Sequence, residues 1–229
     1  MNNILTFSGW GQTPDSLTQS ITDIPDAVIR FFDYSIYGDH ESAFKALSLF
    51  SCDIAIGWSL GGQIALRAIA QNIITPRHLI LLGTPFQFSQ SSNNPEGAPP
   101  EIIANIRAGY LHTPKPMLLN FSAMICQDDV HHDKLLPMLR QYIDTTSPHW
   151  LYWLDELIAY SCTQLDTGTM PPTTIFHGIE DRVIPVEQSN RLASYLPHTT
   201  LHQLAGCGHA PHLHDPNLLN NAILHVISS

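Results

Sequence analysis

The sequence predicts a fold of the α/β class, with a mostly parallel sheet of about six strands. Short apolar runs of strand length alternate with helical patterns through most of the chain. Strands that are joined by helices form open parallel sheets with right-handed crossovers. The run at residues 78–83 is almost entirely apolar, which is typical of a strand covered by helices on both faces.

The apolar runs that we expect to be strands are residues 4–7, 27–32, 53–56, 78–83, 173–178 and 200–204. Helical spacing of apolar residues predicts helices between and after them. These helices are expected at residues 14–22, 41–50, 62–70, 186–196 and 217–227. Thr13 or Asp15 is a candidate cap of the first helix, and Asp215, directly before Pro216, is a candidate cap of the last.

The middle of the chain has a different character. Residues 89–100 are polar and contain Pro and Gly, and helical patterns without a convincing strand follow them. These patterns cover residues 101–110, 115–126, 134–142 and 150–162. We therefore expect a core of residues 1–85 and 171–229 and a helical lid insertion of residues 86–170. Such an insertion would lie over the carboxyl ends of the strands, where ligands bind in parallel sheets.

Composition disfavours several classes of function. The net charge is −10 with only ten Lys and Arg, which disfavours nucleic-acid binding because phosphates require a basic face. No apolar run is long enough to cross a bilayer, and the N-terminus lacks the basic region of a signal peptide. Four cysteines are scattered without C-x-x-C spacing, which favours free thiols in a reducing compartment. We expect a cytoplasmic monomer that does not bind membranes.

A G-x-S-x-G pentapeptide, Gly57-Trp58-Ser59-Leu60-Gly61, stands between a predicted strand and a predicted helix. This context is typical of a nucleophile elbow. Small neighbours are required because the serine sits on a sharp, strained turn. The turn would place the Ser59 hydroxyl at a helix N-terminus, where N–H groups favour developing negative charge. The alternative is a Gly-Ser turn that matches the motif by chance.

Two loops after later strands offer the partners that a nucleophilic serine needs. Asp181 is the candidate acid, with Glu180 as its nearest rival and an exposed turn aspartate as the alternative interpretation. His209 is the candidate base, and its small neighbours leave the imidazole room to reach the serine. The order Ser, Asp, His along the chain is that of the α/β hydrolases.

The chemistry of each group suggests its role. Ser59 becomes a good nucleophile only when a base takes its proton, and His209 is suited to that task near neutral pH. Asp181 would hold the imidazole in one tautomer and stabilise the imidazolium. The backbone N–H groups of Leu60 and Trp10 are expected to form the oxyanion hole.

Other clusters suggest different chemistry. His209, His212 and His214 have H-x-x-H-x-H spacing, and residues 128–133 are rich in Asp and His, so each group is a possible metal site. We expect no metal, because His209 already has a role and the second cluster is more typical of a solvated hinge. Cys207 is an alternative nucleophile that lacks an elbow. No cofactor is expected.

Several motifs together resemble the pimeloyl-acyl-carrier-protein methyl ester carboxylesterases of biotin synthesis, a group of α/β hydrolases. They are Ser8-Gly9-Trp10-Gly11, Gly57-Trp58-Ser59-Leu60-Gly61-Gly62, Asp181 with Val183-Ile184-Pro185, and Gly208-His209-Ala210-Pro211 with Asp215-Pro216. The resemblance covers nearly the whole chain. The triad motifs specify only the superfamily, whereas the paired tryptophans are more specific.

The resemblance implies a serine carboxylesterase that hydrolyses the methyl ester of pimeloyl-acyl carrier protein through a Ser59-His209-Asp181 triad and an acyl-enzyme. It implies substrate contacts from the elbow, the oxyanion loop, the base and one lid segment. These residues are Trp10, Trp58, Leu60, Phe121, Ser122, Met124, Ile125 and His209. Core packing is an alternative role for Trp58 and for the lid segment.

The resemblance also implies that basic lid residues dock the acidic carrier protein that carries the pimeloyl methyl ester. The candidates here are Arg107, Lys115, Lys134 and Arg140. Ordinary solvated surface charge is the alternative for all four. This weak basicity leaves open a generalist short-acyl carboxylesterase or a menaquinone-pathway-type lyase. A catalytically silent binding module is a further alternative, which the complete Ser, Asp and His set disfavours.

Two features depart from the family pattern. Ser8-Gly9 stands where many relatives have His-Gly before the oxyanion tryptophan, so the geometry of this loop is expected to differ. The chain also starts almost directly at the strand before that loop. We therefore expect the first two strands of the family fold to be missing and a different sheet edge to be exposed.

Overall fold

The computed structural model describes residues 1–22 and 24–228, and these residues form a six-stranded sheet in the order β2-β1-β3-β4-β5-β6. All neighbouring pairs of strands are parallel. The expected α/β class and parallel sheet are thus confirmed. The strands are β1 (Asn2–Phe7), β2 (Ala27–Phe31), β3 (Ile54–Trp58), β4 (His78–Leu82), β5 (Thr173–Gly178) and β6 (Thr199–Leu204).

Burial along the strands follows their place in the sheet. Every residue of the central strand β3 is buried, and β4 is buried after its first residue. The edge strand β2 is partly exposed throughout, and β6 at the other edge is partly or fully exposed. The apolar runs in the sequence therefore mark the strands that helices cover on both faces.

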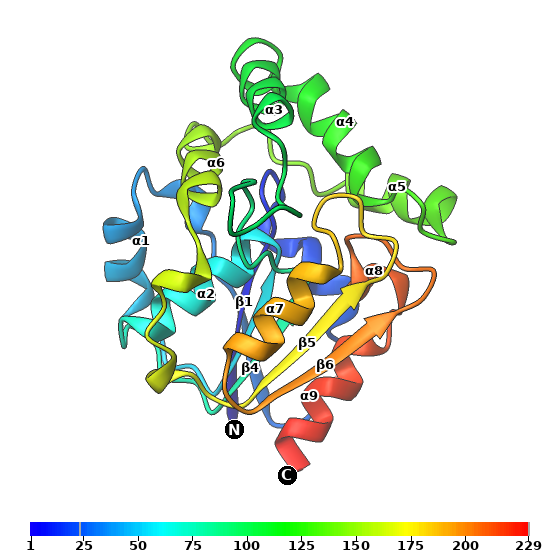
Figure 1. Cartoon of the computed structure of the whole chain (residues 1–229). Coiled ribbons are helices and arrows are strands. Elements are labelled where there is room, and N and C mark those ends of the chain that lie inside the picture. The colour runs from blue at the N-terminus through cyan, green and yellow to red at the C-terminus, as the bar shows by residue number, and fades with distance from the viewer. Residues whose placement is uncertain (23, 229) are drawn as a thin grey trace.

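Among the described residues, five α-helices belong to the sheet-bearing part of the chain, and α7 and α9 cover opposite faces of β6 (Figure 1). Gln203 of β6 donates to Ser189 of α7, whereas Thr200 and His202 line a cavity together with residues of α9. Successive strand side chains alternate between the two faces, as the pleat requires. These helices are α1 (His40–Leu47), α2 (Leu60–Ala70), α7 (Glu187–Tyr195), α8 (Pro211–His214) and α9 (Leu218–Ser228).

The remaining α-helices come between β4 and β5 and gather above the ends of the strands (Figure 1). Trp150 and Trp153 anchor them, because both side chains are buried and their rings lie 5.7 and 5.0 Å from the ring of Tyr34 in the core. The helices are α3 (Pro100–His112), α4 (Pro114–Ile125), α5 (His132–Arg140) and α6 (Trp150–Ala159).

Short elements differ most from expectation. The helix expected at residues 14–22 is a 3₁₀ helix, η1 (Pro14–Ser20), and Thr13 precedes it without a capping hydrogen bond from its side chain. Asp, Ser and Thr make up four of its seven residues, and these residue types have low α-helix propensity. The helix α8 was not expected, and Asp215 follows it and accepts the N–H of Asn217 at 2.9 Å. Three further 3₁₀ turns are η2 (Tyr34–Ile36), η3 (Cys162–Gln164) and η4 (Thr167–Thr169).

The four cysteines are free thiols. Cys207 is fully buried, and burial, reinforced by the nearby charges of Asp129, Asp181 and Glu180, raises the pKa of its thiol well above the usual value. A thiolate at Cys207 is therefore disfavoured, which argues against this residue as a nucleophile. Among the described residues, no helix combines the length and the apolarity that crossing a membrane requires.

His212 in α8 is an unusual core residue. It is fully buried, its ring lies 4.6 Å from that of Trp58, and neither ring nitrogen has a hydrogen-bond partner among the described residues. Burial, with a smaller contribution from His209, lowers the pKa of His212 to about 3. The folded protein therefore holds this imidazole neutral, whereas the unfolded chain binds a proton there in mild acid.

Replacing His212 with Phe should make stability less dependent on pH. The unfolded wild-type chain gains a proton as the pH falls below about 6.5, so the folded state loses about 1.4 kcal/mol per pH unit down to about pH 3. His212→Phe lacks this loss, so its free energy of unfolding relative to wild type should rise by about 2 kcal/mol between about pH 7 and about pH 5.

Chemical denaturation of both proteins at the two pH values measures this difference, and any constant packing cost of the larger ring cancels in the comparison. His112→Phe introduces the same ring at an exposed position and serves as the control. A stability difference that is the same at both pH values would contradict the buried, neutral state of His212.

Candidate active site

Ser59 occupies the sharp turn between β3 and α2. Its backbone angles, φ 55° and ψ −121°, lie outside the regions that residues with a Cβ usually adopt. Gly61 permits the turn, because a Cβ there would lie 2.3 Å from the carbonyl oxygen of Phe7. The Ser59 N–H donates to the carbonyl of Leu82 at 2.9 Å, so β4 also holds the turn. Strain of this kind is commonly found at functional sites.

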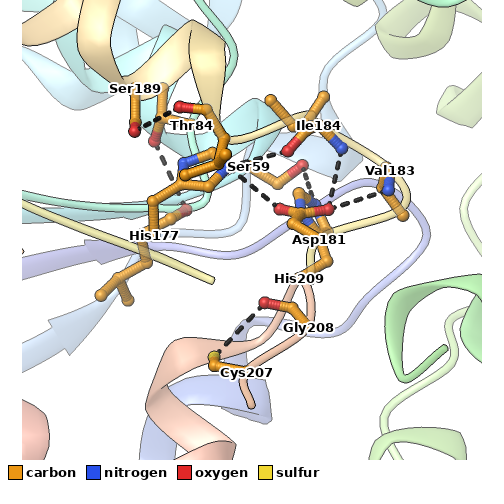
Figure 2. Close-up of polar contacts among 12 residues, drawn as sticks. Ser59, Thr84, His177, Asp181, Val183, Ile184, Ser189, Cys207, Gly208 and His209 are labelled. Carbon is orange, nitrogen blue, oxygen red and sulfur yellow. Dashed lines mark hydrogen bonds and ion pairs between the residues drawn. The ribbon is translucent and has the colours of Figure 1, made fainter. Parts of the chain in front are cut away.

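Figure 2 shows Ser59, His209 and Asp181 in one hydrogen-bonded row. His209 Nε2 lies 2.9 Å from Ser59 Oγ, and His209 Nδ1 lies 2.6 Å from Asp181 Oδ2. All three residues are buried, and Ser59 is only 6% exposed. The structure therefore brings together the three side chains that the sequence suggested as nucleophile, base and acid.

The Asp181 carboxylate is buried and richly hydrogen-bonded. Its Oδ1 accepts the N–H groups of Val183 and Ile184, each at 2.8 Å. Nε2 of His177 donates to the Ile184 carbonyl at 2.8 Å and lies 3.3 Å from Asp181 Oδ2. Burial alone would raise the pKa of the Asp181 carboxyl, but His209 and the hydrogen bond from His177 hold that pKa well below its usual value. The carboxylate therefore remains charged.

A charged Asp181 selects the tautomer of His209. Nδ1 carries the proton that is donated to the carboxylate, so Nε2 is left to accept the hydroxyl proton of Ser59. This arrangement allows His209 to take the proton as Ser59 Oγ attacks a carbonyl carbon, and it stabilises the imidazolium that results. The geometry is suited to acyl transfer.

The backbone N–H groups of Leu60 and Trp10, the expected oxyanion donors, lie in different settings. Leu60 is the first residue of α2, where the helix itself provides no acceptor for the N–H. The Trp10 N–H makes no backbone hydrogen bond to any described residue, and the Trp10 ring lies 5.2 Å from that of Phe121 in the insertion. A Cβ on Gly61 would also meet the carbonyls of Phe7 and Ser8, so the start of α2 abuts the loop that carries Trp10.

The loop that carries Trp10 is fixed by side-chain hydrogen bonds. Ser8 Oγ donates to the Gln12 carbonyl at 3.1 Å, and the Tyr34 hydroxyl donates to the Ser8 carbonyl at 2.8 Å. Trp10 Nε1 donates to the Trp150 carbonyl in the insertion at 2.8 Å. Ser8 therefore closes the loop on itself.

A mostly apolar cavity of about 280 Å³ lies between the insertion and the loop that carries Asp181. Phe121 and Met124 of α4 line one side, and Val183 and Pro185 line the other. Ser59, which is 6% exposed, does not line this cavity. A second cavity, of about 480 Å³ between β6 and α9, is lined by none of the triad residues.

Three other residues implied as substrate contacts lie elsewhere. Trp58 is buried and donates from Nε1 to the His209 carbonyl at 2.8 Å. Ser122 Oγ donates to the Leu119 carbonyl at 2.7 Å. The Ile125 carbonyl accepts the backbone N–H of His209 at 2.9 Å. None of the three lines the cavity, and two of them hold the backbone of His209.

The four basic residues of the insertion differ in their surroundings. Arg107 makes a two-point ion pair with Asp155, with N–O distances of 2.8 and 3.0 Å. Arg140 donates to side-chain and backbone oxygens of α4. Lys115 and Lys134 are exposed. Both arginines are thus engaged within the insertion, and the lysines offer more accessible positive charge.

Two residues that contact the triad region were not predicted to do so: His177, and Asp129, which the sequence offered only as part of a possible metal cluster at residues 128–133. His177 supports Asp181, and its only signal was its place at a strand end, four residues before the acid. Asp129 of the insertion comes within 4.8 Å of ligand atoms of Cys207 and His214, the spacing of a possible metal site among the described residues. Its carboxylate already accepts the N–H of Gly208 at 2.9 Å, and hydrogen bonds account for the cluster.

Comparison with known proteins shows the family to which the chain belongs. A model of the alpha/beta hydrolase family matches residues 4–222. The chain is 23% identical over 171 residues to the biotin biosynthesis bifunctional protein BioHC of Cellvibrio japonicus, covering 74% of this chain and 34% of that protein. The chain therefore matches about a third of that relative. It is also 26% identical over 172 residues to the pimeloyl-[acyl-carrier protein] methyl ester esterase of Aromatoleum aromaticum. That alignment covers 71% of this chain and 69% of the esterase.

The fold is also similar to that of a solved esterase from Exiguobacterium antarcticum, with a TM-score of 0.84 at 15% identity, covering 100% of this chain and 92% of that one. Identity at this level shows the shared fold alone. The family model, in contrast, spans the loop that carries Trp10, the turn at Ser59, the helices between β4 and β5, and the loops that carry Asp181 and His209. The chain therefore belongs to the alpha/beta hydrolase family.

Proposed function

We propose that this carboxylic ester hydrolase uses Ser59 as its nucleophile, His209 as its general base and Asp181 as the residue that orients the base. The continuous row of hydrogen bonds from Ser59 Oγ to the Asp181 carboxylate carries the proposal. The N–H groups of Leu60 and Trp10 would stabilise the oxyanion. The substrate that we propose is the methyl ester of pimeloyl-acyl carrier protein.

The reaction follows from the arrangement of these groups. Ser59 Oγ forms a bond to the ester carbonyl carbon while its proton passes to His209 Nε2, and negative charge develops on the carbonyl oxygen. The tetrahedral intermediate collapses, the bond to the methoxy group breaks, and methanol leaves with the proton from His209. Water, deprotonated by His209, then attacks the acyl-enzyme and releases the free carboxylate together with Ser59.

The names of the relatives and the form of the insertion support the choice of substrate. A curated relative that aligns with 71% of this chain is named for the methyl ester of pimeloyl-acyl carrier protein. The cavity beside Phe121 and Met124 offers an apolar surface for an acyl chain. We further propose that residues 86–170 form a lid over a core of residues 1–85 and 171–229, and that the lid moves to admit the substrate to the buried Ser59.

Ser59→Ala should abolish hydrolysis of the carrier-protein methyl ester, with a loss of turnover on the order of 10⁶ because no nucleophile remains. Mass spectrometry of the carrier-protein substrate before and after incubation measures the loss of the methyl group. The variant should also fail to restore growth of a biotin auxotroph that lacks its own esterase.

Ser92→Ala makes the same change at an exposed position of the loop before α3 and should keep wild-type activity. Growth supported by Ser59→Ala would remove Ser59 as the nucleophile. An active wild-type esterase that leaves the carrier-protein ester intact would remove the proposed substrate and leave the catalytic residues in place.

Asp181→Asn should lower kcat by about 10⁴, because an amide no longer fixes the tautomer of His209 or stabilises its charged form. Hydrolysis of a small chromogenic ester measures the effect independently of the physiological substrate. Glu180→Gln changes the neighbouring acid that the sequence left as a rival, and it should keep most of the activity. A larger loss in Glu180→Gln than in Asp181→Asn would reverse the assignment.

A generalist short-acyl carboxylesterase is the second candidate, because Arg107 and Arg140 are engaged within the insertion. If the insertion docks the carrier protein, Lys115→Ala combined with Lys134→Ala should raise KM for the carrier-protein ester several-fold, about 1 kcal/mol of lost electrostatic attraction. KM for a small p-nitrophenyl ester should not change.

Lys45→Ala removes an exposed positive charge from the core helix α1 and serves as the matched control. Equal KM values for the double variant and wild type on the carrier-protein ester would remove the docking role of the lysines. Faster turnover of short p-nitrophenyl esters than of the carrier-protein ester by wild type would favour the generalist enzyme.

A further inference from the structure

The loop between α4 and α5, residues 126–131, joins the insertion to the loop that carries His209. At the end of α4, the Ile125 carbonyl accepts the His209 N–H at 2.9 Å. The Val130 N–H donates to the Gly206 carbonyl, also at 2.9 Å. Figure 1 shows α5 above α8, the short helix that follows His209. The insertion therefore makes backbone hydrogen bonds at two positions, Gly206 and His209, of the loop at residues 206–209, which we call the histidine loop.

Asp129 lies at the centre of this junction. Its side chain is 1% exposed, and its Oδ2 accepts the N–H of Gly208 at 2.9 Å. Its Oδ1 accepts the N–H of His131 at 2.8 Å, and Nδ1 of His214 lies 3.1 Å from both carboxylate oxygens. A buried carboxylate is costly unless it is paired or hydrogen-bonded, and these donors meet that requirement without a metal ion.

The contact with Gly208 bears directly on His209. Asp129 holds the N–H of Gly208 and Ile125 holds the N–H of His209, so two successive backbone donors are fixed by the insertion. The approach is close, because a Cβ on Gly208 would lie 2.9 Å from the Ile125 carbonyl oxygen. Rotation of the backbone at these two residues would move the imidazole relative to Ser59.

The same loop also contacts the segment that carries the acid. Asp128 accepts a hydrogen bond from Arg182 Nε at 2.5 Å, and Arg182 directly follows Asp181. This pair is exposed, with 43% and 59% of the two side chains accessible, so it contributes little by itself. The buried Asp129 contact is therefore the stronger connection between the insertion and the catalytic loops.

We infer that Asp129 is a positioning residue, which holds the backbone at Gly208 so that the His209 imidazole stays between Ser59 and Asp181. The inference rests on the proposed role of His209 as the base. It assigns the insertion a part in catalysis besides covering the substrate. A displacement of about 1 Å in a catalytic group can cost about 100-fold in rate, so loss of this contact has a measurable consequence.

Asp129→Ala and Asp129→Asn test this role against Asp133→Asn, which removes an exposed carboxylate from the start of α5. We expect kcat for a small ester, and the rate at which a fluorophosphonate labels Ser59, to fall about 100-fold in Asp129→Ala. Asp129→Asn keeps one oxygen for the Gly208 N–H, so its kcat and labelling rate should fall only about tenfold. KM should change little, and Asp133→Asn should match wild type.

Proton NMR gives a readout that a purely structural role would not move. The proton shared by His209 Nδ1 and Asp181 gives a far-downfield signal in wild type, which should broaden or shift in both Asp129 variants and persist in Asp133→Asn. Asp129→Asn is nearly isosteric with wild type, and its thermal unfolding is compared directly, so the test does not depend on the alanine variant folding.

Wild-type kcat, labelling rate and downfield signal in folded Asp129→Asn and Asp129→Ala would overturn the inference. A failure of the proposed function has a different signature. If wild type labels at Ser59 but leaves the carrier-protein ester intact, only the substrate is wrong. If wild type is not labelled at all, Ser59 is not the nucleophile, and the NMR comparison still decides whether Asp129 positions His209.

Discussion

The buried charge of Asp181 is the constraint on which the rest of the site depends. A carboxylate removed from water is costly unless donors surround it. The turn after β5 meets part of this need by directing the N–H groups of Val183 and Ile184 at one oxygen, while His177 and His209 approach the other. The loop after β6 must therefore deliver an imidazole to this position, and the Ser59 hydroxyl lies at the far side of that ring.

Ser59 meets the imidazole because of two further constraints. The elbow stores backbone strain at φ 55°, and the tight approach of α2 to the carbonyls of Phe7 and Ser8 maintains it. The same approach sets the start of α2 against the loop that carries Trp10. One packing contact thus serves the nucleophile and both candidate oxyanion donors, and the absence of a side chain at Gly61 makes it possible.

The sequence predicted the features that depend on local pattern and missed those that depend on contacts between distant segments. Alternating apolar runs identified the strands, and the elbow, Asp181 and His209 each follow a strand, so their meeting at one end of a parallel sheet could be foreseen. Asp129 lies 79 residues from Gly208, and nothing around it in sequence indicates that contact. His212 was considered as a metal ligand, whereas its ring is packed against Trp58 without a polar partner.

The hydrogen bonds that join residues 125–130 to the histidine loop limit how modular this insertion is. The helices between β4 and β5 form one continuous segment, which suggests that the whole segment could be exchanged for that of a relative. In this chain, however, the segment is tied to residues 206–209, because the main chains of Ile125 and Val130 make hydrogen bonds with that loop. A chimaera made by grafting a foreign insertion would therefore have to carry its own matching histidine loop.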